Sequence, residues 1–162
     1  MNKLIFATHN PNKVKEVREL LSDSFEILGL NDIGFYEDII EDKLTIMENS
    51  IKKAEFVKTK TGYDCFADDT GLEVDALNGH PGVFSKRFAG PNSSSDDNIN
   101  KLLEMLGNNT NRAARFKTVI SLSKNSKIIT FEGICEGNIA YKRMGNLGFG
   151  YDPVFIPKNR NI

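Results

Sequence analysis

A short apolar run that ends in two adjacent carboxylates constrains this chain more than any other feature. Cys65-Phe66-Ala67 is typical of a buried strand, and Asp68 and Asp69 follow at once. In an open α/β sheet, ligands gather at the carboxyl ends of the strands. An unpaired charge is expensive to bury, so carboxylates placed there suit a hard cation such as Mg²⁺. The sequence therefore indicates a magnesium site at this strand end or, as the plainer alternative, a polar turn at Gly71.

The directions of the two carboxylates follow from strand geometry. Successive side chains of a strand point to opposite faces, so Asp68 and Asp69 separate to the two faces if the strand continues through them. One of them can then face a ligand while the other pairs locally. Beyond the turn at Pro81-Gly82, Lys86 and Arg87 add cations. One short segment thus holds acids that suit a metal and cations that suit an anion.

The composition narrows the classes of protein to consider. A chain of 162 residues, 40% of them hydrophobic, is long enough for one domain with a substantial core. Its net charge of -1 provides no general basic field, which argues against a nucleic-acid-binding protein. No apolar run in the sequence is long enough to span a membrane. Cys65 and Cys135 match no zinc-site spacing and indicate reduced thiols in a cytoplasmic protein.

A strand, a loop and a helix follow one another near the start of the chain. Leu4–Ala7 is a short apolar run, and apolar residues at helical spacing follow the loop Thr8–Lys13. The start of a helix offers free N–H groups to a phosphate, and Lys13 adds a full positive charge. The loop lacks the glycines of a Walker motif, so an ordinary connection remains the alternative. His9 is either an exposed turn residue or a ligand.

Periodicity and turn residues predict the other elements. Thr45 and Glu48 have the spacing of a capping box, so a helix should begin there and end at Gly62. The apolar face of this helix should consist of Met47, Ile51, Ala54 and Val57. We also expect a strand over 25–30 and a helix from Ser94 or Ser95 to Leu106. A hairpin of strands over 115–123 and 127–134 should follow, and then a turn and a new strand at 136–139.

The last informative stretch is rich in glycine and aromatic residues. Within Gly145–Phe155, three glycines would let the backbone approach a flat ligand closely. Phe149 and Tyr151 supply aromatic surface, and Asp152 supplies an acceptor. From the residues alone, the segment could equally be a tight connection to a final strand.

Several of these motifs, in this order, resemble the inosine triphosphatase-like family of pyrophosphatases, which hydrolyse non-canonical purine nucleoside triphosphates. The family's central signature reads Ala-Asp-Asp-Ser-Gly-Leu, then Val-Asp-Ala-Leu, then Pro-Gly-Val-Tyr-Ser-Ala-Arg. The matching segments are Ala7-Thr8-x-Asn10-x-x-Lys13, Ala67–Leu72, Val74–Leu77, Pro81–Arg87 and Phe149–Pro153. Thr70 replaces the usual serine and keeps its hydroxyl, and Phe84 and Lys86 are mild departures.

The resemblance implies a fold and a reaction. The fold would be α/β, an elongated two-lobed structure around a long mixed β-sheet with a central substrate cleft. The reaction would be Mg²⁺-dependent hydrolysis of a nucleoside triphosphate between its α and β phosphates, giving a nucleoside monophosphate and pyrophosphate. The expected substrates are inosine and xanthosine triphosphates and their deoxy forms, removed from the nucleotide pool. The resemblance also implies a cytoplasmic homodimer.

The resemblance assigns roles to individual residues. Asp69 is the expected catalytic carboxylate, which orients the attacking water and contacts Mg²⁺, with Asp68 and Glu41 as further metal-associated acids. For Glu41 the alternative is a solvated acidic patch, and for Lys53 a solvated lysine whose stem lies on the core. The expected substrate-binding residues are Thr8, His9, Asn10, Pro11, Asn12, Lys13, Lys53, Thr70, Phe149, Gly150, Tyr151 and Asp152.

The chain also departs from the family pattern. Lys43 stands where the family has a glycine, and family members continue beyond the position of Ile162 with a helix and a Ser-His-Arg motif that help hold the purine base and a phosphate. We interpret residues 1–162 as a single inosine triphosphatase-like domain that is incomplete at its carboxyl-terminal end relative to the family. The alternatives are a Maf-like pyrophosphatase that acts on pyrimidine or modified nucleotides, and an inactive nucleotide-binding remnant.

Overall fold

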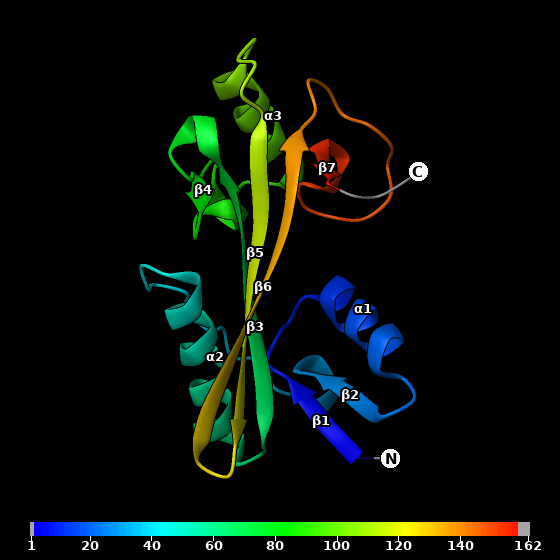
Figure 1. Ribbon diagram of the computed structural model, residues 1–162. Coiled ribbons are helices and arrows are strands. Elements are labelled where there is room, and N and C mark those ends of the chain that lie inside the picture. Colours follow the sequence, from blue (N-terminus) through cyan, green and yellow to red (C-terminus); the bar gives the residue numbers. More distant parts are fainter. Residues whose placement is uncertain (1, 159–162) are drawn as a thin grey trace. The chain divides into compact units, whose positions relative to one another are not determined.

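The computed structural model describes residues 2–158, which form a mixed α/β structure (Figure 1). The chain divides into two compact units. The first comprises Met1–Asp69 and Val119–Glu132, and the second comprises Thr70–Thr118 and Gly133–Ile162. The expectation about the carboxyl-terminal end of the chain concerns a region outside the described residues.

Seven strands form one mixed sheet in the order β2-β1-β3-β5-β6-β7, with β4 paired to β3. β1 runs parallel to β2 and β3, whereas β4 is antiparallel to β3 and β7 is antiparallel to β6. The predicted α/β class is therefore confirmed. The strands are β1 Asn2–Phe6, β2 Phe25–Gly29, β3 Cys65–Val74, β4 Pro81–Gly82, β5 Ala113–Lys124, β6 Lys127–Ile139 and β7 Phe155–Pro157, and the α-helices are α1 Pro11–Leu21, α2 Ile46–Thr61 and α3 Ser95–Leu106.

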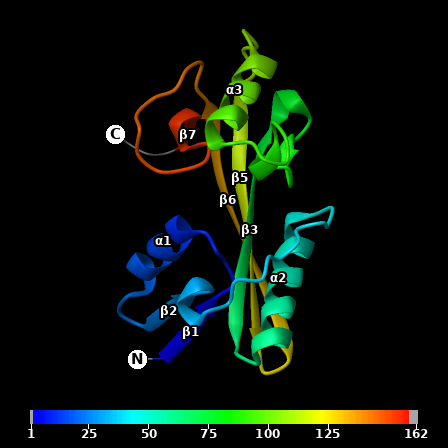
Figure 2. The same cartoon turned by 180° about the vertical axis from the view of Figure 1, so that it is seen from behind.

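In the first unit, strand alternation builds a core on each face of the sheet. Phe6 and Phe66 stack with ring centroids 4.4 Å apart and pack with Val14 of α1. The residues that flank them point to the other face, where Cys65 and Ala67 pack against Ala54 and Val57 of α2. The two helices accordingly lie on opposite sides of these strands in both views (Figures 1 and 2).

The second unit has its own core around α3. Ser94 and Asp97 form a full capping box at the start of α3. Gly107 follows the last residue of the helix, as predicted. The buried face of α3 packs against strands β3, β5 and β6 and against the segment before β7. The members of this core are Leu72, Val74, Ile99, Leu102, Leu106, Ala114, Ile139, Tyr151 and Val154.

Three local expectations are wrong. Gly71 does not turn the chain, because β3 continues to Val74 and pairs there with β4, Leu72 opposite Gly82. Residues 136–138 are not a turn either, because β6 runs on to Ile139. Met47 is 41% exposed, and Ile46 is the buried residue at the start of α2. The hairpin of β5 and β6 is confirmed: Asn125 and Ser126 both have positive φ, as its two-residue turn requires.

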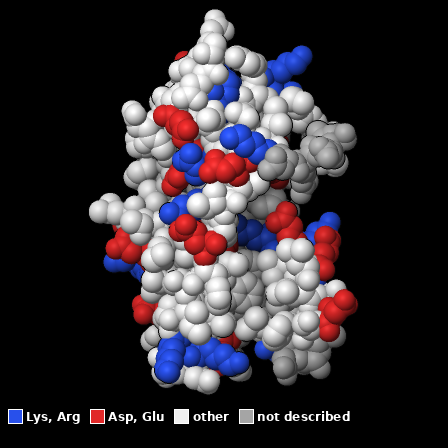
Figure 3. Space-filling model, viewed as in Figure 1, with Lys and Arg blue, Asp and Glu red and all other residues white. Residues whose placement is uncertain are grey.

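Two broader observations concern the whole described chain. Within residues 2–158, no helix is both long and apolar enough to cross a membrane. Basic and acidic side chains lie near one another at several places on the face shown in Figure 3.

We expect a thiol reagent to modify Cys135 and to spare Cys65 in the folded protein. Burial raises the pKa of the Cys65 thiol to about 11, and its Sγ donates to the carbonyl of Ala54. A raised pKa keeps this thiol protonated at neutral pH, and the thiolate is the reactive form. Cys135 is exposed. Mass spectrometry after iodoacetamide treatment should find one modified cysteine before denaturation and two after it, whereas rapid modification of Cys65 in the folded protein would contradict its burial.

Candidate functional site

The loop between β1 and α1 is a well-formed helix start. The side chain of Asn10 accepts hydrogen bonds from the backbone N–H groups of Asn12, at 2.9 Å, and Lys13, at 3.4 Å. Thr8 Oγ1 in turn accepts from the backbone N–H of Asn10, and Pro11 occupies the first turn, where it needs no donor. These contacts hold the loop in one shape and bring Lys13 to the carboxyl end of β1.

His9 connects this loop to a neighbouring segment of the first unit. Its Nδ1 lies 3.0 Å from Asn31 Oδ1, and its Nε2 donates to the carbonyl of Glu37 at 3.1 Å. Its ring also stacks on Phe35 with centroids 6.4 Å apart. The histidine therefore fastens the predicted phosphate loop to residues 31–37, and both of its ring nitrogens are engaged in doing so.

Asp68 and Asp69 lie on different faces of β3, as the alternation of a strand predicts. Asp68 shares the face of Phe66 and meets Lys13, whose Nζ lies 2.5 Å from Asp68 Oδ2. Asp69 shares the face of Ala67, on the side of α2. The middle of β3 thus presents a carboxylate to each of the two helices of the unit.

Lys53 of α2 joins Asp69 to a third carboxylate. Its side chain is 9% exposed, and its Nζ lies 2.7 Å from Glu41 Oε1 and 3.8 Å from Asp69 Oδ1. Glu41 comes from the irregular segment before α2, and this contact joins that segment to the helix. The pairing places Glu41 beside Lys53 and Asp69, with its own side chain 26% exposed.

The charges of this cluster act on one another across the strand. Burial alone lowers the pKa of Lys53, but attraction to its carboxylate neighbours, Glu41 first among them, raises it above the ordinary value. Burial raises the pKa of Asp69, and repulsion by Glu41 adds to this, while Lys53 and Lys13 act in the opposite direction. The positive charge of Lys13 therefore acts on Asp69, as does that of Lys53. We call Lys13, Glu41, Lys53, Asp68 and Asp69 the charged cluster.

The donor chemistry of the charged cluster fits a magnesium ion that arrives with a polyphosphate. Within residues 2–158, no three His, Cys, Asp or Glu side chains come close enough to form a ready-made metal cage. Glu41 and Asp69, however, both approach the same ammonium group, so a cation can reach both acids from one position. Mg²⁺ is usually held in this way, by one or two carboxylates plus substrate phosphates.

Two polar residues of α2 that sequence reasoning missed lie beside the cluster. Asn49 Oδ1 accepts from the backbone N–H of Lys43 at 2.9 Å. Ser50 donates to the hydroxyl of Ser121 at 2.7 Å and also reaches the carbonyl of Ala67. Both are fully buried. A sequence signal existed, because polar side chains at 49, 50 and 53 share the helix face that carries Ala54 and Val57 into the core.

The other predicted site residues belong to the second unit and are held by local contacts. Thr70 Oγ1 lies 2.9 Å from Thr118 Oγ1. Asp152 accepts from the backbone N–H of Phe149 at 2.9 Å, which closes the glycine-rich loop. Tyr151 is 6% exposed and donates its hydroxyl to the carbonyl of Ser85, so its ring belongs to the core of the unit. Gly150 has a φ of 59°, which favours glycine.

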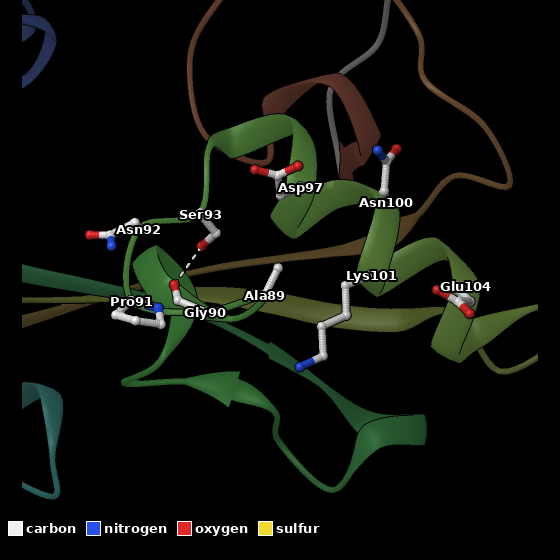
Figure 4. A pocket seen from close by; sticks show the side chains of 9 residues that line it. All are labelled: Ala89, Gly90, Pro91, Asn92, Ser93, Asp97, Asn100, Lys101 and Glu104. Atoms are coloured by element: carbon white, nitrogen blue, oxygen red, sulfur yellow. Dashed lines mark hydrogen bonds between the residues drawn. The ribbon is translucent and has the colours of Figure 1, made fainter.

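The second unit also has a shallow pocket that contains none of the predicted residues. It lies between the loop 89–93 and the start of α3, and Figure 4 shows Asp97, Asn100 and Lys101 along its helical side. Lys101 donates to the carbonyl of Phe88, and Ser93 to that of Gly90. These side chains stabilise the loop, and nothing in their arrangement resembles the charged cluster.

Comparison with known proteins places these features in a family. The family model described as Ham1 family matches residues 4–162. The dITP/XTP pyrophosphatase of Flavobacterium johnsoniae is 55% identical over 157 residues, which cover 97% of this chain and 82% of that protein. The dITP/XTP pyrophosphatase of Porphyromonas gingivalis is 50% identical over 163 residues, which cover 100% of this chain and 84% of that protein.

Solved structures agree with the sequence comparison. A HAM1 protein from Coxiella burnetii superposes with a TM-score of 0.85 at 38% identity, covering 96% of this chain and 81% of that one. A nucleoside-triphosphatase, or dITP/XTP pyrophosphatase, from Mycobacterium abscessus gives a TM-score of 0.79 at 35% identity, covering 98% of this chain and 85% of that one.

Proposed function

The chain belongs to the Ham1 family, and from this premise we propose that it is a pyrophosphatase that hydrolyses non-canonical purine nucleoside triphosphates. The proposed substrates are inosine, deoxyinosine and xanthosine triphosphates, and the products are a nucleoside monophosphate and pyrophosphate. The relatives named dITP/XTP pyrophosphatase support the substrate class.

The observation that carries the proposal is the charged cluster. Two lysines from separate helices meet three carboxylates, two of which lie in the middle of the buried strand β3. Buried charges are costly, and a cluster of this kind is a poor way to stabilise a fold. It is well suited to a ligand that combines a cation with a polyphosphate, because the carboxylates can bind the cation and the lysines can bind the phosphates.

The proposed reaction is attack of water on the α-phosphorus. A new bond forms between the water oxygen and this phosphorus, and the bond from phosphorus to the oxygen that bridges the α and β phosphates breaks. The bridging oxygen leaves with pyrophosphate and keeps the electron pair of the broken bond. Asp69 holds the attacking water and accepts its proton, a role that requires the ionised carboxylate.

The remaining groups of the first unit hold the polyphosphate. Lys13 and Lys53 would exchange their contacts with Asp68 and Glu41 for phosphate oxygens and stabilise the negative charge that develops during the reaction. The N–H groups at the start of α1 would bind a further phosphate. Glu41, Asp68 and Asp69 would hold Mg²⁺, which would supply positive charge against the phosphate oxygens.

The second unit supplies the proposed contacts to the rest of the nucleotide. Thr70 directly follows Asp69 in the chain, so its hydroxyl is a candidate donor to the substrate. The segment Phe149–Asp152 would lie against the base, with the half-buried Phe149 as the aromatic surface. Tyr151 and Asp152 would act by holding this segment in shape, since their polar atoms already bind Ser85 and Phe149.

A product assay tests the proposed function. Inosine triphosphate incubated with the protein and Mg²⁺ should yield inosine monophosphate and pyrophosphate in equal amounts, and chelation of the metal should stop the reaction. Adenosine and guanosine triphosphates serve as controls and should react much more slowly. Release of orthophosphate would contradict cleavage between the α and β phosphates. Turnover of modified pyrimidine nucleotides alone would favour a Maf-like activity, and binding without turnover would favour an inactive remnant.

Two further proposals follow the same family relationship. We propose a homodimer, which analytical ultracentrifugation can test directly. We also propose a cytoplasmic location, where the nucleotide pool lies and where the two free cysteines would stay reduced.

A further inference from the structure

The oxygen and the nitrogen of the buried Asn49 amide differ in their hydrogen bonding. Its side chain lies in the first turn of α2 and is 1% exposed. Its Oδ1 accepts from the backbone N–H of Lys43, whereas its Nδ2 makes no hydrogen bond of ordinary geometry within the described residues. The amide nevertheless lies close enough to Asp69 to lower the pKa of that carboxyl. A buried donor left without a good partner costs stability, so its retention needs an explanation.

The position of Asn49 relates it to three members of the charged cluster. Lys43 follows Glu41 by two residues, so the Oδ1 contact restrains the irregular segment that carries Glu41. Lys53 lies four residues after Asn49, on the same face of the helix. The amide also acts on Asp69, whose pKa it lowers. Asn49 therefore restrains the segment that carries Glu41, projects from the helix that carries Lys53 and acts on Asp69.

We propose that Asn49 is a positioning residue of the charged cluster. Its Oδ1 holds the segment of Glu41, and its Nδ2 donates to Asp69 when a cation binds, which fixes the carboxylate oxygen that faces the cation. The inference rests on the proposed function, since it assumes that Glu41 and Asp69 receive the metal. Such residues act through the ligands they orient and do not touch the reacting atoms.

Ser50 provides the comparison that separates this role from ordinary packing. It is the next residue of α2, is completely buried and donates to Ser121 and toward the carbonyl of Ala67. Its contacts do not reach the segment of Glu41. A substitution there removes a buried polar group of the same helix without changing the support of Glu41 and Asp69.

A metal titration on the protein saturated with an inosine triphosphate analogue that has a methylene group between its α and β phosphates gives the first readout, because the metal is expected to bind together with the phosphates. We expect Asn49→Ala to weaken Mn²⁺ binding, measured by calorimetry, by roughly 10–100-fold. Ser50→Ala should leave the affinity for Mn²⁺ close to that of the parent, even if it lowers the thermal stability. If Asn49→Ala does not fold, Asn49→Ser retains a polar group of smaller size and should weaken binding in the same direction. Unchanged Mn²⁺ affinity in a folded Asn49 variant would overturn the proposal, as would a parent that binds no Mn²⁺.

Steady-state kinetics gives the second readout and separates the two proposals. With inosine triphosphate, the folded Asn49 variants should lose kcat by roughly 10–100-fold and change KM little, because the lysines that bind the phosphates remain. A loss of stability with parental kcat and parental Mn²⁺ affinity would show that Asn49 is only a core residue. If the parent hydrolyses no nucleotide, the proposed function fails, and the Mn²⁺ titration alone still decides the role of Asn49.

Discussion

Asp69→Asn should reduce the turnover of inosine triphosphate by roughly 10²–10⁴-fold, with little change in the fold. The amide has nearly the shape of the carboxyl group, but it can neither accept the proton of the attacking water nor hold a cation by charge. Asp69 lies at the point where Lys53 and Glu41 meet, so the substitution affects the centre of the charged cluster. Pyrophosphate release under saturating Mg²⁺ measures the effect.

Asp64→Asn is the matched control for this variant. Asp64 lies just before β3 and pairs with Lys58 at 2.8 Å, and this pair is partly exposed. The same chemical change there should leave turnover near that of the parent, because exposed ion pairs contribute little and Asp64 lies outside the charged cluster. Turnover by Asp69→Asn at the rate of the parent would refute the assignment of Asp69.

Lys53→Met should lower the free energy of unfolding by about 3–5 kcal/mol, the cost expected when one partner of a buried ion pair is removed. The substitution keeps most of the aliphatic stem and removes the ammonium group. Glu41 and Asp69 would then lose the cation they share, and their mutual repulsion would rise. Chemical denaturation followed by circular dichroism measures the change.

Lys52, the residue before Lys53, is a control that carries the same charge in a more exposed ion pair. Lys52 pairs with Asp42 at 2.7 Å, but the carboxylate side chain of that pair is 56% exposed. Lys52→Met should therefore lower the free energy of unfolding much less than Lys53→Met does. If both variants lost the same stability, Lys53 would not occupy a buried charge cluster. If Mg²⁺ were found to stabilise Lys53→Met more than the parent, this would support competition between the lysine and the cation for the same acids.

Local chemistry was enough to predict the helix ends. Thr45 and Ser94 cap α2 and α3 with their hydroxyl groups, and Gly62 and Gly107 follow the last helical residues. These signals act within a few residues and need no tertiary contact. The alternation of β3 was equally predictable and places Asp68 with Lys13 and Asp69 with Lys53.

Features that depend on distant partners were not predictable in the same way. Thr70 and Gly71 have the composition of a turn, but pairing with β4 keeps β3 extended through them. Glu41 lies in an irregular segment, and its place became clear only through the contact with Lys53. Helical spacing places Asn49 and Ser50 on the buried face of α2, but it does not identify the residues that they meet there. In each case the deciding interaction joins residues whose proximity no local pattern encodes.

The most direct test of the account is to locate a bound metal. Crystals grown with Mn²⁺ and an analogue of inosine triphosphate that has a methylene group between its α and β phosphates would show the ion by anomalous scattering. We expect an anomalous peak in contact with the carboxylate of Asp69 and with a phosphate oxygen, and Lys13 and Lys53 turned toward the phosphates. A metal-bound nucleotide seated away from Asp69 and Glu41, with the lysine–carboxylate pairs unchanged, would contradict the account.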